Sequence, residues 1–190
     1  MLKKKYSVII VCLLVFGCSI LKPEPTQLEL DALNQKSLEL HKKGLYKEGL
    51  ALAEKNFEFA KVNFESNHPN IMASMNTLAL LYMSQGRYGE AETLYKEALQ
   101  ISKTVLGKKH PDTITILDNL ADLNMSQGRY EEAENLYKEA LQISKTVLGK
   151  KHPDTITILI DLALLYHLQD RYKGVQHKKV APSINHWKFF

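Results

Sequence analysis

The sequence has little cysteine and none of the short motifs that usually carry enzyme chemistry. Its two cysteines, Cys12 and Cys18, both lie near the N-terminus. The rest of the chain can therefore form no disulfide and must be held together by packing. No phosphate-binding loop, nucleophile elbow, His-Glu-x-x-His helix or cysteine cluster occurs in it. We therefore expect a protein without catalytic activity, metal or cofactor.

The net charge is also low once the N-terminal leader is set aside. The formal charge of +4 includes Lys3, Lys4 and Lys5, and removal of residues 1–17, which contain no acid, lowers it to +1. This balance gives no electrostatic reason to expect nucleic-acid binding. Apolar residues make up 45% of the chain, enough to form a continuous core.

Residues 1–17 have the three parts of a secretory signal peptide: a basic start, an apolar stretch over residues 6–16, and a small residue before Cys18. The apolar stretch is shorter than the roughly 20 residues that span a bilayer, which favours a processed leader. The segment Val15-Phe16-Gly17-Cys18 resembles the lipobox of bacterial lipoproteins. This resemblance implies that Cys18 becomes the acylated first residue of the mature chain. The alternative is an uncleaved signal anchor, in which Cys18 is an ordinary small residue.

The same resemblance bears on location. Ser19, rather than an acid, follows Cys18. In the lipoproteins that the leader resembles, this favours transit to the outer membrane. We therefore expect a lipid-anchored protein of the bacterial cell envelope, on the outer membrane facing the periplasm rather than on the inner membrane. Residues 18–25 would then link the anchor to the folded domain.

A repeat of 42 residues runs through the rest of the chain. The segment Ser84–Tyr88 recurs as Ser126–Tyr130, and residues 83–117 match residues 125–159 at all but two positions. Such identity indicates recent duplication. The copies cover about residues 26–67, 68–109, 110–151 and 152–172, the last being half a repeat, and we expect residues 173–190 to form an irregular tail.

Each of the three full copies predicts two amphipathic helices, because apolar residues recur twice at helical spacing. In the second copy Gly86 lies between the two helices, at a position suited to positive φ, and Gly107 ends the second helix. His110-Pro111-Asp112 then begins the next copy, with Pro111 suited to a first helical turn. The equivalent His68, His110 and His152 are each one repeat apart, so we interpret them as linker residues rather than metal ligands.

The residues of the second copy also follow a known pattern. Leu78-Ala79-x-x-Tyr82 … Gly86-x-Tyr88-x-x-Ala91-x-x-x-Tyr95-x-x-Ala98 resembles a tetratricopeptide repeat, and the His-Pro-Asp linker resembles the longer repeats of the kinesin light chain type. The resemblance implies an all-α fold, a right-handed solenoid of helical hairpins with three full repeats and a half repeat. The small alanines are expected where helices cross, with the tyrosines filling the space beside them.

In such a solenoid the first helix of each pair lines a concave groove, where a peptide or protein segment is the expected ligand. Asparagine and aspartate there can bond an extended main chain, and methionine gives an adaptable apolar floor. Because aspartates replace the lysine and asparagine of the family's clamp for a C-terminal carboxylate, we expect a basic or neutral segment. A solvated inner surface without a ligand is the alternative. The family's usual groove positions correspond here to Asn76, Leu80, Met83, Asp118, Asn119, Asp122, Met125 and His167.

The first helix of the fourth copy, Ile156 to Leu168, is apolar on almost all of its faces, although a solenoid normally ends in a polar cap. Three explanations stay open. Trp187, Phe189 and Phe190 could fold back on it, a second subunit could cover it, or the C-terminus could be a truncated or frame-shifted remnant. The leading hypothesis is a membrane-anchored scaffold. The alternatives are a structural envelope lipoprotein that self-associates through Ile156–Leu168, or a truncated repeat remnant.

Overall fold

The structure, a computed structural model, describes the backbone of residues 27–180 and the side chains of residues 28–170. This part of the chain contains seven helices and no strand, which confirms the all-α prediction. The helices pair as three hairpins followed by one long helix. They are α2 (Gln27–Lys42), α3 (Tyr46–Asn63), α4 (Pro69–Ser84), α5 (Tyr88–Val105), α6 (Pro111–Ser126), α7 (Tyr130–Val147) and α8 (Pro153–Val180).

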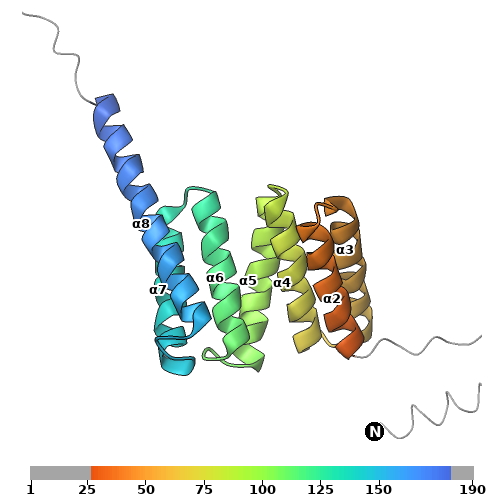
Figure 1. Ribbon diagram of the computed structural model, residues 1–190. Helices are drawn as coiled ribbons and strands as arrows, with labels where there is room; N and C mark the ends of the chain where they lie inside the picture. The colour runs from red at the N-terminus through yellow and green to blue at the C-terminus, as the bar shows by residue number, and fades with distance from the viewer. Residues whose placement is uncertain (1–26, 181–190) are drawn as a thin grey trace, which may run out of the picture.

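The hairpins stack side by side into a single array (Figure 1). Each helix contacts the next one along the chain, and the first helices also contact one another, α2 with α4, α4 with α6 and α6 with α8. Between consecutive second helices, such as α3 and α5, the described residues make no such contacts. The first helices are therefore closer together than the second helices, so the array curves with the first helices on its concave side.

The ends of the helices follow from glycine and from the His-Pro linker. Gly86 has φ +75° at the end of α4, and nothing lies within 4 Å of where its Cβ would be, so the backbone conformation rather than space favours glycine. At the start of α6, the Nδ1 atom of His110 accepts a hydrogen bond from the backbone N–H of Asp112 at 3.2 Å, and Pro111 is the first helical residue. His68 caps α4 in the same way. In the structure these linker histidines therefore act as helix caps.

The core forms where the helices cross. Ala79, Ala91 and Ala98 are fully buried, as is Tyr95, while Tyr82 is partly buried against the same cluster. An alanine at a crossing lets two helix axes approach, and the neighbouring tyrosine ring fills the space beside it. The predicted packing is therefore observed.

The fourth copy differs from the prediction after residue 172. We expected an irregular tail from residue 173, but α8 continues as one helix to Val180. Asp170 stands at the position where Gly44, Gly86 and Gly128 take positive φ, and no residue other than glycine does so in the described chain. Without that glycine the chain has no low-cost turn and the helix continues, so that α8 projects beyond its neighbours (Figure 1).

The remaining expectations about the termini fall outside the described residues. These are the signal peptide at 1–17, acylation of Cys18, the linker at 18–25 and the aromatic residues after 180. Within the helices that the structure does describe, none has the length and apolar character needed to cross a membrane.

Candidate functional site: the concave face

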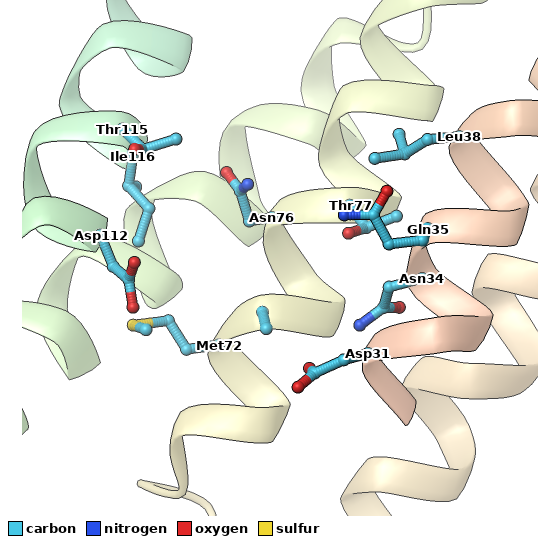
Figure 2. A pocket seen from close by; sticks show the side chains of 11 residues that line it. Asp31, Asn34, Gln35, Leu38, Met72, Asn76, Thr77, Asp112, Thr115 and Ile116 are labelled. Atoms are coloured by element: carbon cyan, nitrogen blue, oxygen red, sulfur yellow. The ribbon is translucent and has the colours of Figure 1, made fainter. Parts of the chain in front are cut away.

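An open cavity lies on the concave side, among the first helices of the first three repeats. It has a volume of about 420 Å³ and carries two carboxylates, Asp31 from α2 and Asp112 from α6. Figure 2 shows these two residues on opposite sides of the cavity, with Asn76 of α4 between them. A cavity of this size matches a few residues of a peptide rather than a large cofactor.

Asparagines give this cavity its hydrogen-bonding character. Asn34 is only 8% exposed, and its Oδ1 atom has no hydrogen-bond partner although it is buried. Asn76 accepts a hydrogen bond from the side-chain amide of Asn119 at 2.9 Å, which joins α4 to α6 across the concave face. A buried acceptor without a donor costs about 1–3 kcal/mol, so Asn34 is a site where a bound N–H would be stabilising.

The second half of the concave face is acidic. Asp118 and Asp122 lie one turn apart on α6, and Asp161 approaches from α8. Burial, with smaller contributions from Asp122, Asp161 and Asp154, raises the pKa of Asp118 to about 7. Burial also raises the pKa of Asp122, against the lowering effect of the hydrogen bond that the Tyr137 hydroxyl donates to it. Asp118 and Asp122, two of the groove residues predicted in the third repeat, therefore lie close together, and no positive charge contributes to the shifts of their pKa values.

The other predicted groove residues lie in less open surroundings. Met83 and Met125 are half-buried. Met83 packs against the buried core that contains Tyr95, and Met125 against the one that contains Tyr137, so both side chains are partly structural. Leu80 is half-buried on α4, and His167 is exposed on α8. These four residues do not line the cavity between α2, α4 and α6.

Charge is distributed unequally between the two faces. Neither α4 nor α6 contains a lysine or arginine, and neither does α8 before Arg171. Most other basic residues lie on the second helices and in the linkers, although α2 carries Lys36 and Lys42, and several of them are paired. Arg129, for example, binds Glu92 of the preceding repeat through two hydrogen bonds of 2.8 and 3.1 Å. Glu92 therefore joins two repeats.

Sequence reasoning missed several residues of this surface. Lys36 and Ser37 stand where the second copy has Leu78 and Ala79, so the first copy departs from the family pattern, yet α2 supplies Asp31 and Asn34 to the cavity. The repeat register contained the signal, since Asn34 is one repeat before Asn76. Asp161 is likewise one repeat after Asn119. Among the described side chains, no group of three histidine, cysteine or acidic residues is placed to hold a metal ion.

Known proteins support the same architecture. The family model described as "Tetratricopeptide repeat" matches residues 71–146 and 119–174. Among curated protein sequences, none is significantly similar to this chain.

Solved structures show the fold as well. A kinesin light chain-like protein of Podosopora anserina with nearly identical TPR-like repeats has a TM-score of 0.71 at 22% identity, covering 83% of this chain and 79% of its own. BtubC (BKLC) of P. vanneervenii has a TM-score of 0.69 at 17% identity, over 90% of this chain and 72% of its own. The Yersinia enterocolitica type III secretion translocator chaperone SycD has a TM-score of 0.57 at 13% identity, over 77% and 90%. Because the family model matches more than half of its residues, this chain belongs to the tetratricopeptide repeat family.

Proposed function

We propose that this protein is a non-catalytic scaffold that binds an extended, basic segment of another protein in its concave groove. Tetratricopeptide repeats typically serve protein–protein interaction, and their curvature forms an extended binding surface. One observation supports the basic ligand. Of the concave helices, α6 carries carboxylates and amides and α4 carries amides, and neither contains a lysine or arginine.

The chemistry of the cavity favours hydrogen-bond donors. The carboxylates of Asp31 and Asp112 and the orphan amide oxygen of Asn34 are acceptors. The main-chain N–H groups and the cationic side chains of an extended segment would supply the matching donors. A negatively charged segment would instead meet the carboxylates of Asp31 and Asp112 in the cavity, at a cost in free energy.

A peptide array tests this proposal. Labelled full-length protein is applied to peptides of about 15 residues that differ in sequence and charge, a length that crosses the first helices of several repeats. We expect basic peptides to be retained and Asn76→Leu to weaken their retention. Asn135→Leu, the same substitution at an exposed position of α7, is the control. Equal effects of both substitutions would exclude the groove as the binding site, and retention of acidic peptides instead would exclude a basic ligand.

We also propose that Cys18 anchors the scaffold to the bacterial envelope, on the outer membrane facing the periplasm. The support is the sequence of the leader, with its basic start, short apolar stretch and Gly17-Cys18 junction. Metabolic labelling with a fatty acid, comparing wild type with Cys18→Ala, tests this. Equal labelling of the two would show that Cys18 is not acylated.

A second candidate function is self-association through α8. Leu117 of α6 is fully buried beneath the helix that follows it, whereas its equivalent, Leu159 of α8, is 39% exposed. Ile156 and Ile160 are exposed as well. In the described chain the fourth repeat has no second helix after α8. The α8 of a second copy, packed antiparallel to this one, would run in the direction that such a second helix takes. Light scattering tests this, with Ile160→Asp as the variant. A chain that is monomeric over the whole accessible concentration range would rule the candidate out.

A further inference from the structure

Three carboxylates meet between α6 and α8, apart from the cavity between α2, α4 and α6. They belong to Asp118 and Asp122 of α6 and Asp161 of α8. Each is at least partly buried; the charge of Asp161 raises the pKa of both Asp118 and Asp122, and the charge of Asp122 raises that of Asp118. Burying like charges together is unfavourable unless a positive group neutralises them.

The described protein supplies no such positive group. None of the charges that shift the pKa of these three carboxyl groups is positive. Hydrogen bonding is incomplete too, since Asp118 Oδ1 is buried without a partner. The Tyr137 hydroxyl from α7 donates to Asp122, which satisfies one oxygen of the cluster.

A second tyrosine is placed at the cluster without a partner. Tyr95 of α5 is fully buried, and its hydroxyl has no hydrogen-bond partner. Burial raises the pKa of that hydroxyl, and the charge of Asp122 raises it further, which places Tyr95 near the cluster. A buried hydroxyl normally has a partner, so an unmatched one near Asp122 indicates that the site is incomplete in the free protein.

The cluster occurs once in the array. One repeat earlier, the residues at the positions of Asp118, Asp122 and Asp161 are uncharged: Asn76, Leu80 and Asn119. Only the junction of the third repeat with α8 therefore brings three carboxylates together in the described chain. A ligand group bound there would fix where along the groove the segment lies.

The spacing of the three carboxylates indicates which kind of cation they can bind. No three acidic residues of the described chain are close enough to hold a metal ion, which needs its oxygen ligands at about 2–2.6 Å. An ammonium or guanidinium group presents several N–H donors and can bridge carboxylates that are farther apart. We infer that Asp118, Asp122 and Asp161 form the receptor for one lysine or arginine side chain of the bound segment, an inference that rests on the proposed groove function.

Fluorescence anisotropy of the full chain with defined peptides tests this receptor. The probes are short serine–alanine peptides of one length that carry central lysine, arginine, norleucine or glutamate residues. We expect lysine or arginine peptides to bind about tenfold more tightly than the norleucine peptide, the size of effect expected of a partly buried charge pair. Asp161→Asn should remove most of that preference without changing the affinity for norleucine. Glu97→Gln, an exposed change on α5, should leave both affinities unchanged.

The outcomes separate this inference from the function on which it rests. If the norleucine peptide binds but lysine and arginine give no advantage, or if Asp161→Asn keeps the full preference, the receptor is wrong and the groove function stands. If wild type binds none of the peptides, the groove function fails together with the receptor. Because Asp161→Asn removes a repelling charge and keeps the side-chain shape, circular dichroism should show it folded, so a loss of preference reports on binding.

Discussion

Replacing Asp118 by Asn should stabilise the protein, and the effect should grow with pH. An aspartate in an unfolded chain has a pKa near 3.9. In the folded protein, burial and the neighbouring carboxylates Asp122, Asp161 and Asp154 raise the pKa of Asp118 to about 7. Between these two values the folded state binds more protons than the unfolded state. The contribution of Asp118 to stability is therefore full at low pH and is lost as pH rises toward 7.

The shift of about three pKa units corresponds to roughly 4 kcal/mol above pH 7, at about 1.4 kcal/mol per unit. Asn keeps the shape of the side chain without its charge. The free energy of unfolding of Asp118→Asn should therefore exceed that of wild type by an amount that increases by about 3 kcal/mol from pH 4.5 to pH 8. Urea unfolding of the full chain followed by circular dichroism measures this difference, with the exposed Glu97→Gln as control. A difference that does not change with pH would refute the reasoning.

Three further predictions concern the turns and the contacts between repeats. Gly86→Ala should destabilise by roughly 1–2 kcal/mol because φ is +75°, and Gly86→Asn should cost less, which urea unfolding would show. His110→Ala should cost about 0.5–2 kcal/mol of thermal stability through loss of the helix cap, whereas His110→Asn should retain most of it. A double-mutant cycle of Glu92→Ala and Arg129→Ala should give a coupling of about 0.5–1 kcal/mol that weakens with added salt. No coupling there would mean that the pair does not join the repeats.

Much of the fold could be predicted because the same local signals recur every 42 residues. Gly86 and Pro111 set the helix ends through backbone conformation alone, which the sequence shows directly. The continuation of α8 was missed although Asp170 was already aligned with Gly86. The absence of a turn glycine is as informative as its presence, because a helix without a favourable stop continues.

The site was less predictable because it depends on which side chains meet. The register places Asp118 and Asp161 on first helices, but only the packing of α6 against α8 shows that they share one buried cluster. Periodicity also could not show that Met83 packs against the core. The burial of a side chain and its lack of hydrogen-bond partners depend on how the helices pack in the assembled array, so the sequence alone does not show them.

The central claim is that the concave face binds a basic segment, and photo-crosslinking tests it most directly. The lysine peptide, carrying a benzophenone at one end, is bound to the full chain and irradiated, and the attachment sites are mapped by mass spectrometry. The sequences of α4 and α6 differ enough to be distinguished. We predict attachment to α4, α6 and α8, with excess unlabelled peptide preventing it. Attachment mainly to the second helices α5 and α7 would contradict the account.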